Sequence, residues 1–230
     1  MNPKGSKIDL RGHTAAMFDV FNTLLFPEDW PFLVALADFH GTDPGVLNNA
    51  LKKLKPEAET GKMTAGERIS RVAASLDHPI SDRKAREFAD LELAEMVAGS
   101  VVYPGAREAL ELFAGHLKTE LVSNAHPNSR RMVIALGLTK FVDRGYFSCD
   151  RDVRARKPDE GIYRAVLSGL AVDPHQCVYF GDGGDHELEP PRAQGMMVVW
   201  VRSPNQCAEG IPDCDYVVDG VDELRKLCVF

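Results

Sequence analysis

The sequence predicts an α/β fold: a Rossmann-like, doubly wound parallel sheet core with a small helical bundle inserted into it. Three observations support this prediction. Short apolar runs recur along the chain, segments with helical spacing separate most of them, and one long segment near the N-terminus has helical spacing only. Strands that alternate with helices are typical of a parallel sheet covered by helices on both faces.

The expected strands are short apolar runs followed by turn or helix signals, as buried strands of a parallel sheet usually are. They are residues 16–21, 119–123, 146–149, 177–180, 196–201 and 216–218. Between and after them, apolar residues recur at three- and four-residue spacing, which predicts helices. These helices are residues 106–117, 129–136, 159–170 and 221–227.

Residues 28–99 have a different pattern, with helical spacing throughout and no convincing strand. Turn signals at residues 41–44, at Gly61 and at His78-Pro79 divide this segment. We expect four helices, at 30–40, 44–54, 65–76 and 82–97, packed as a small bundle over the sheet. The predicted domains are therefore an α/β core, residues 1–27 and 100–230, and a helical domain, residues 28–99.

Length and composition exclude several classes of protein. The 230 residues are 44% hydrophobic, enough for one large domain or two modest ones. No stretch approaches the ~20 apolar residues that span a bilayer, and the first residues lack the apolar run of a secretion signal, so we expect no membrane partner and a cytoplasmic location. A formal charge of −7 argues against nucleic acid but leaves room for a small phosphorylated ligand.

The cysteines are too widely spaced for a disulfide framework or a zinc site, because no C-x-x-C pair occurs. We expect free thiols at Cys149, Cys177, Cys207, Cys214 and Cys228.

Asp19 is the most informative residue, because this ionisable group ends an apolar strand pattern. Burying a carboxylate costs several kcal/mol unless cations and hydrogen bonds compensate it. Ser123-Asn124 and Asp182 also follow predicted strands, and ligands of open parallel sheets bind at the carboxyl ends of the strands. Lys157 precedes a proline that can begin a helix, which would place its ammonium near a helix N-terminus. We expect these side chains to converge.

These segments, in this order, resemble the motifs of the haloacid dehalogenase (HAD)-like hydrolase superfamily. The resemblance covers nearly the whole chain, and the helical insert resembles the superfamily's C1-type cap. The matching motifs are residues 18–24 around Asp19, Ser123-Asn124, Lys157-Pro158-Asp159 and residues 181–184 around Asp182.

The resemblance implies a chemistry for each residue. Asp19 would be the nucleophile that forms an aspartyl-phosphate, with Ser123, Lys157 and Asp182 as the other catalytic residues. Ser123, Asn124 and Lys157 would hold the phosphoryl oxygens. Mg²⁺ would bind Asp19, Asp182 and the backbone carbonyl of Phe21. The resemblance thus implies a Mg²⁺-dependent phosphatase that acts on a small-molecule substrate.

Two positions depart from the pattern of the superfamily's phosphatases. Phe21 stands where they usually carry a second aspartate, and losing a positioned acid or base typically costs ~10²–10⁴ in rate. Activity would then be slow or would use a substitute such as His126 or a cap residue. His186 replaces an acid that commonly follows Asp182. Because imidazole is a poor ligand for Mg²⁺, a neighbouring carboxylate takes over or the site is weakened.

These departures keep two alternatives open beside hydrolysis of a phosphomonoester. An aromatic residue at position 21 resembles the 2-haloacid dehalogenase branch, in which Asp19 would displace a halide. The glycine loop around Asp182 resembles the metal loop of the phosphatases instead, and we weight it more heavily. The second alternative is a catalytically impaired HAD-fold binding protein. Substrate identity and oligomeric state stay open.

Overall fold

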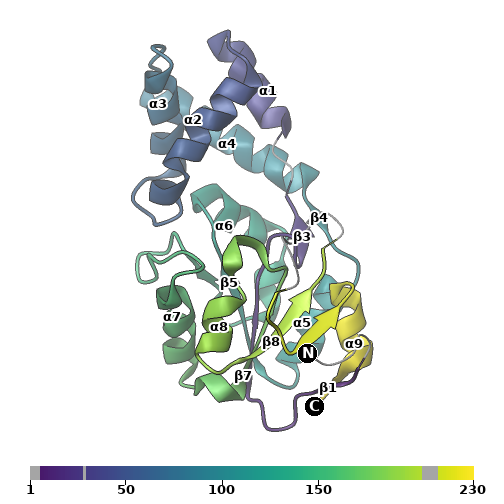
Figure 1. The fold of residues 1–230 in the computed structure, drawn as a ribbon. Coiled ribbons are helices and arrows are strands. Elements are labelled where there is room, and N and C mark those ends of the chain that lie inside the picture. The colour runs from purple at the N-terminus through teal and green to yellow at the C-terminus, as the bar shows by residue number, and fades with distance from the viewer. Residues whose placement is uncertain (1–5, 28–29, 204–211) are drawn as a thin grey trace.

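A computed structural model of the chain describes residues 6–27, 30–203 and 212–230 (Figure 1). Within these residues, six strands form a parallel sheet in the order β6-β5-β2-β7-β8-β9. The strands are β2 (Ala15–Phe18), β5 (Lys118–Ser123), β6 (Tyr146–Phe147), β7 (Cys177–Gly181), β8 (Met197–Val201) and β9 (Tyr216–Val218). Each of the six expected strands is present, which confirms the predicted parallel sheet.

Strand β2, which leads to Asp19, lies inside the sheet between β5 and β7. Phe18 is in register with Leu121 of β5 and with Phe180 of β7. All three of these strands end at the same edge of the sheet because they are parallel. The residues that follow β2, β5 and β7 therefore meet there.

Helices cover both faces of the sheet, because side chains alternate between the faces along each strand. Ala16 and Phe18 of β2 pack into one apolar cluster with α5 (Ala106–Ala114) and α6 (Pro127–Ala135). Ala15 and Met17 pack into another with α7 (Glu160–Leu170). Two shorter helices, α8 (Glu189–Ala193) and α9 (Leu224–Leu227), complete these layers.

The insert forms a bundle of helices above the carboxyl edge of the sheet (Figure 1). Its helices are α1 (Trp30–His40), α2 (Pro44–Ala58), α3 (Ala65–Ser75) and α4 (Asp82–Gly99). The bundle has its own apolar cluster, which includes Phe32, Leu47 and Ile69. Reciprocal hydrogen bonds between Thr64 and Glu67 begin α3, a strong helix-start signal. The domain boundaries stay a prediction, and residue 28 lies outside the described residues.

Several short elements were not predicted. Strand β3 (Leu25–Phe26) pairs antiparallel with β4 (Val101–Val102), and β1 (Ile8–Asp9) pairs parallel with β10 (Cys228–Val229). Strands of two residues carry no readable periodicity, and α8 is only five residues long. The β3–β4 pair joins the two ends of the insert.

Among the helices of the described residues, none is both long and apolar enough to cross a bilayer. Cys149, Cys177, Cys214 and Cys228 are free thiols, as expected. Cys207 lies outside the described residues.

Candidate functional site

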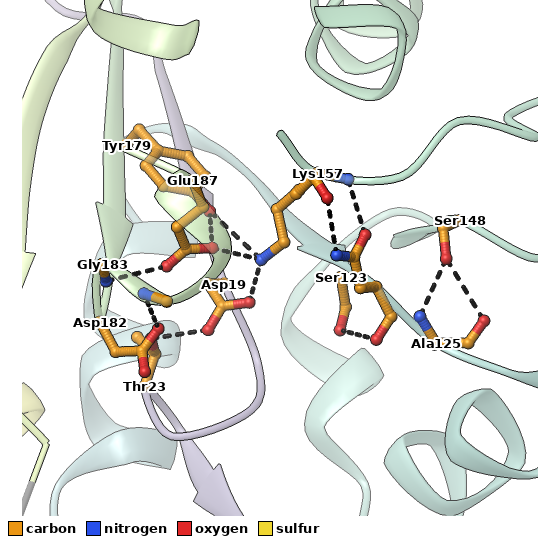
Figure 2. Close-up of polar contacts among 12 residues, drawn as sticks. Asp19, Thr23, Ser123, Ala125, Ser148, Lys157, Tyr179, Asp182, Gly183 and Glu187 are labelled. Carbon is orange, nitrogen blue, oxygen red and sulfur yellow. Dashed lines mark hydrogen bonds and ion pairs between the residues drawn. The ribbon is translucent and has the colours of Figure 1, made fainter. Parts of the chain in front are cut away.

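The carboxyl edge of the sheet and the helical bundle enclose a cavity of about 450 Å³. Asp19, Asn124, Lys157 and Asp182 line it, together with Phe21. These residues come from the ends of β2, β5 and β7 and from the segment before α7. Figure 2 shows the Asp19, Lys157 and Asp182 side chains close together.

Asp19 is buried, with 3% of its surface exposed, and it is held from several sides. Its backbone N–H donates to the Phe180 carbonyl at 2.8 Å, and the Thr23 hydroxyl donates to its Oδ2 at 2.7 Å. Burial, and then the charge of Glu187, raise the pKa of Asp19 to about 6, although Lys157 and Thr23 oppose the shift. At neutral pH the carboxylate is therefore mostly ionised, as a nucleophile must be.

Lys157 lies between two carboxylates (Figure 2). Its Nζ donates to Oδ1 of Asp19 and to Oε2 of Glu187, and it lies 3.4 Å from the Tyr179 hydroxyl. Burial disfavours the charge of Lys157, but Asp19 and Glu187 outweigh burial and raise its pKa. The ammonium stays charged and offsets part of the negative charge of the site.

Asp182 is buried against the other carboxylates and has few partners. Its Oδ1 accepts a hydrogen bond from the Gly184 N–H at 3.1 Å, whereas its Oδ2 is buried without a hydrogen-bond partner in the described part of the chain. Burial, followed by the charges of Asp19 and Glu187, raises the pKa of Asp182 to about 9. An orphaned buried carboxylate oxygen calls for a cation or a proton.

Glu187 is a site residue that sequence analysis did not name; the sequence indicated only that a carboxylate beside His186 takes over or that the site is weakened. The Tyr179 hydroxyl donates to Glu187 Oε2 at 2.6 Å, and the Gly183 N–H donates to Oε1 at 3.2 Å. A side chain at Gly181 would collide with the Glu187 carboxylate, so glycine leaves room for it. Glu187 therefore supplies the acid that position 186 lacks.

The turn after Asp182 explains why Glu187, and not His186, faces the cavity. Residues 184–186 form a short 3₁₀ turn in which Asp185 has a φ of 50°. His186 is exposed, and its Nδ1 lies 3.0 Å from Oε1 of Glu189. Sequence spacing alone cannot show a left-handed residue of this kind, because any residue type except glycine adopts it only occasionally.

The carboxylates of Asp19, Asp182 and Glu187 fit a divalent cation. Each offers one oxygen, and the three oxygens lie within 4.8 Å of one another. Hard oxygen donors are the ligands that Mg²⁺ prefers. The orphaned Oδ2 of Asp182 adds an acceptor without a donor. The Phe21 carbonyl stays a predicted ligand, on a residue that lines the same cavity.

Ser123 and Asn124 lie at the end of β5 but do different things. The Asn124 amide binds the backbone of Lys157 twice: Nδ2 donates to its carbonyl at 3.0 Å, and Oδ1 accepts from its N–H at 2.7 Å. Asn124 thus positions the segment that carries Lys157. Ser123 is fully buried, does not line the cavity, and its hydroxyl donates to the Asn124 carbonyl at 3.3 Å. The phosphoryl-binding roles of both residues stay predictions.

His126 lines the cavity beside these residues. Its Nδ1 is buried without a hydrogen-bond partner among the described residues. Burial, and then the charges of Arg68 and Lys55, lower the pKa of His126 well below its usual value. The ring is therefore neutral at physiological pH.

The helical bundle contributes charged groups to the cavity from α2. Lys55 and the buried Glu59 line it, and Arg156, next to Lys157, donates from Nε to Glu59 Oε2 at 2.6 Å. This ion pair joins the bundle to the core.

Comparisons with known proteins agree with the geometry. The family model "haloacid dehalogenase-like hydrolase" matches residues 13–195. Bifunctional epoxide hydrolase 2 of Sus scrofa is 26% identical over an alignment of 208 residues, and the match covers 82% of this chain. The matched region is 36% of that relative, so the chain spans about a third of its length.

Solved structures of the same fold include dehalogenases and phosphatases. The 2-haloacid dehalogenase of Pseudomonas syringae pv. Tomato DC3000 superimposes with a TM-score of 0.67 at 20% identity, over 94% of this chain and 97% of that one. A HAD phosphatase from Thermococcus onnurineus gives a TM-score of 0.63 at 20% identity, over 93% of this chain and 96% of the other. Other structures of this fold contain magnesium. From its fold, its site and its family match, the chain belongs to the haloacid dehalogenase-like hydrolases.

Proposed function

We propose that the chain is a Mg²⁺-dependent hydrolase of a small phosphomonoester that acts through an aspartyl-phosphate on Asp19. One observation carries the proposal: the buried site holds three carboxylates, from Asp19, Asp182 and Glu187, against the single ammonium of Lys157. A surplus of buried negative charge is costly unless a proton or a cation balances it. Without metal, the raised pKa of Asp182 means that a proton balances part of it. A divalent cation would replace that proton and leave the site able to accept an anionic phosphoryl group.

The residues of the chain perform distinct steps in this proposal. An oxygen of Asp19 attacks phosphorus, the bond between phosphorus and the ester oxygen breaks, and the alcohol leaves with a proton from water. Water then attacks the phosphorus of the aspartyl-phosphate, which releases phosphate and restores the Asp19 carboxylate. Lys157 holds a phosphoryl oxygen and neutralises the charge that develops there.

The remaining residues bind and orient. Asn124 fixes the backbone of Lys157 and holds another phosphoryl oxygen with the second hydrogen of its Nδ2. Ser123 reaches a phosphoryl oxygen only if its hydroxyl turns away from the Asn124 carbonyl. Asp19, Asp182 and the Phe21 carbonyl hold the Mg²⁺, with Glu187 beside them. When bound, the ion screens the carboxylates from the phosphoryl group and polarises it. Phe21 offers no proton, so turnover is slower than with an acid at that position.

Dehalogenation of a short 2-haloacid is the second candidate, and Phe21 favours it. A halide leaves without protonation, so a phenylalanine at position 21 costs that reaction nothing. Asp19 would attack the carbon that bears the halogen, the carbon–halogen bond would break, and water would hydrolyse the resulting ester. The surplus of carboxylates argues against this candidate. A dehalogenase needs no metal ion, so no metal would balance the negative charge of these carboxylates.

A paired assay separates the two candidates. Phosphate release from a panel of small phosphomonoesters is measured with Mg²⁺ and with EDTA, and halide release from 2-chloropropionate is measured with EDTA. We expect phosphate release that needs Mg²⁺ and disappears in Asp19→Asn. The exposed Asp38 of α1 provides the matched control, and Asp38→Asn keeps full activity.

Other outcomes would replace the proposal. Halide release in EDTA with no phosphate release would establish the dehalogenase. If neither reaction occurs, and Asp19→Asn still supports the function of the protein in cells, the chain is a non-catalytic binding protein of the family.

A further inference from the structure

On the bundle side of the cavity, a lysine shares its carboxylate partner with an arginine of the core. Lys55, in the last turn of α2, lines the cavity with a half-exposed side chain. Its Nζ lies 3.8 Å from Oε1 of Glu59, while the other oxygen of Glu59 accepts from Arg156 at 2.6 Å. Two cations therefore share one carboxylate. Arg156 makes the closer contact with Glu59, and Lys55 makes the longer one.

The neutral imidazole of His126 is the second group that we consider in this cavity. His126 lines the cavity, and its buried Nδ1 has no hydrogen-bond partner in the described ranges. Lys55 lines the same cavity, and its charge, after burial and the charge of Arg68, lowers the pKa of His126. Arg68 itself is paired with the buried Glu92. Of these two cations, Lys55 is the one with charge to offer a ligand.

The same cavity is also lined by the carboxylate site with Lys157 and by the exposed Asp185 of the loop after β7. In the proposed function, a divalent cation and the phosphoryl group occupy the part of the cavity next to the carboxylates and Lys157. The cavity of about 450 Å³ lies in the range of small-molecule sites. The part of the substrate that remains, the leaving alcohol, then faces Lys55 and His126.

We propose that Lys55 and His126 form a second anion-binding subsite, and that the preferred substrate is a phosphomonoester whose alcohol carries a second anionic group. The group is a carboxylate or a second phosphate, which share the charge and the acceptor oxygens that an ammonium and an imidazole N–H recognise. The inference rests on the proposed phosphatase function and names its substrate class.

The test compares esters of similar size that differ in this second group. Phosphoglycolate carries a carboxylate, 1,2-ethanediol bisphosphate carries a phosphate, and ethyl phosphate carries neither. We expect a kcat/KM for at least one charged ester about tenfold or more above that for ethyl phosphate. The charged ester that is preferred identifies the second group.

Variants of Lys55 and His126 test whether these residues cause the preference for charged esters. Lys55→Met keeps the length of the side chain and removes the charge, so it lowers kcat/KM for the charged ester about tenfold and leaves ethyl phosphate unchanged. Lys55→Arg keeps the preference. His126→Phe keeps a ring without an N–H and lowers the same ratio. Lys52→Met, an exposed lysine of the same helix, changes nothing.

The outcomes separate this inference from the proposed function. Ethyl phosphate hydrolysis that Asp19→Asn abolishes, together with equal rates on all three esters or an equal effect of Lys55→Met on each, overturns the subsite and leaves the phosphatase intact. If none of the three esters is hydrolysed, the proposed phosphatase function is wrong, whatever the subsite binds. Calorimetric titration of the Asp19→Asn variant with phosphoglycolate and ethyl phosphate, in Mg²⁺, then decides the subsite: equal affinities overturn it.

Discussion

The charged form of Asp182 is strongly disfavoured in the site. Its pKa of about 9 is above the value of 3.8 of an unperturbed aspartate, because burial and two neighbouring carboxylates disfavour the charged form. The native metal-free state therefore binds a proton that the unfolded chain releases between these two values. Stability without metal falls as the pH rises through that window.

The substitution Asp182→Asn tests this account. It removes a carboxyl group that must take up a proton to stay buried, so the metal-free variant should melt at a higher temperature than the wild type at pH 8 and lose much of the pH dependence. Mg²⁺ should raise the melting temperature of the wild type, whereas the variant should bind Mg²⁺ more weakly, because an amide carries no negative charge. Calorimetric melting between pH 5 and 8.5, with and without Mg²⁺, measures both effects.

Asp38→Asn serves as the control for Asp182→Asn, because it changes the same group at an exposed position of α1. A metal-free Asp182→Asn variant that melts below the wild type at pH 8 would contradict the account.

His126 should make the protein sensitive to acid. Burial, with Arg68 and Lys55, lowers its pKa below the usual 6.5, so the native state binds fewer protons than the unfolded chain below that pH. Stability is therefore lost as the pH falls from 6.5 toward the native pKa. In His126→Asn, urea unfolding should show a flatter decline between pH 6.5 and 4.5.

His175 supplies the comparison for this pH experiment, because it is exposed in a turn before β7. His175→Asn should follow the wild-type pH profile, and a His126→Asn profile as steep as the wild type would disprove the role of His126.

The sequence was informative about some site residues and silent about others, for physical reasons. Asp19 and Asp182 follow neighbouring parallel strands, so their proximity follows from the order of the strands. The inward direction of Glu187 depends on the left-handed backbone of Asp185, which no spacing rule contains. Ser123 ends its strand as expected, yet its hydroxyl donates to the neighbouring carbonyl and not into the cavity.

At the scale of helices, the contact between α4 and α6 depends on a buried polar cluster. Arg68 pairs with Glu92, and Asn128 Nδ2 donates to Glu92 Oε2 at 2.7 Å and to the Ala89 carbonyl at 2.6 Å. From sequence spacing alone, Arg68 and Arg71 look equally solvated on α3. Only the tertiary packing separates them, because Arg71 is half exposed and pairs with Glu57 at 2.8 Å.

Removal of one partner should reveal this difference. Arg68→Met leaves the buried Glu92 without its cation and should lower the free energy of unfolding by about 3–5 kcal/mol. Arg71→Met breaks the exposed pair and should cost less than about 1 kcal/mol. Urea unfolding of both variants gives the comparison.

The double variant Arg68→Met/Glu92→Leu checks the mechanism. It removes both charges and should recover most of the loss. If the single Arg68→Met variant is as stable as Arg71→Met, the cluster contributes no more than a surface ion pair.

Element length decided which parts of the fold could be predicted. Strands such as residues 119–123 and 177–180 are long enough for their apolar pattern to be distinct, and each appears close to its expected bounds. The pairs β1–β10 and β3–β4 depend on contacts between distant residues. Each of these strands has only two residues, which is too short to show an apolar pattern. Proline at positions 190 and 191 hid α8, because prolines also mark turns.

For the whole molecule, the β3–β4 pair determines how the bundle is attached. Phe26 is in register with Val101, so the insert leaves and rejoins the core at neighbouring positions. The six-stranded sheet and α5 to α9 lie outside the insert. The sheet and its own helices are therefore complete without residues 28–99, although Met96 packs against the core and Asn128 of α6 is hydrogen-bonded to Glu92 of α4.

Replacement of residues 28–99 by a short Gly-Ser linker should leave a core that unfolds cooperatively, at a lower temperature than the full chain. Because this replacement removes Lys55, any remaining hydrolysis should show no preference for charged esters. Calorimetry and the ester assay measure the two expectations. A product without a cooperative transition would show that the insert belongs to the folding unit of the core.

Arg156 and Lys157 are consecutive residues with different attachments: the first is bound to Glu59 of the bundle, and the second to Asp19. A single peptide unit thus connects the helical bundle to the ammonium that neutralises Asp19. A displacement of Glu59 with α2 would also displace the backbone beside Lys157, so the position of the bundle and the charge balance at Asp19 are coupled through this ion pair.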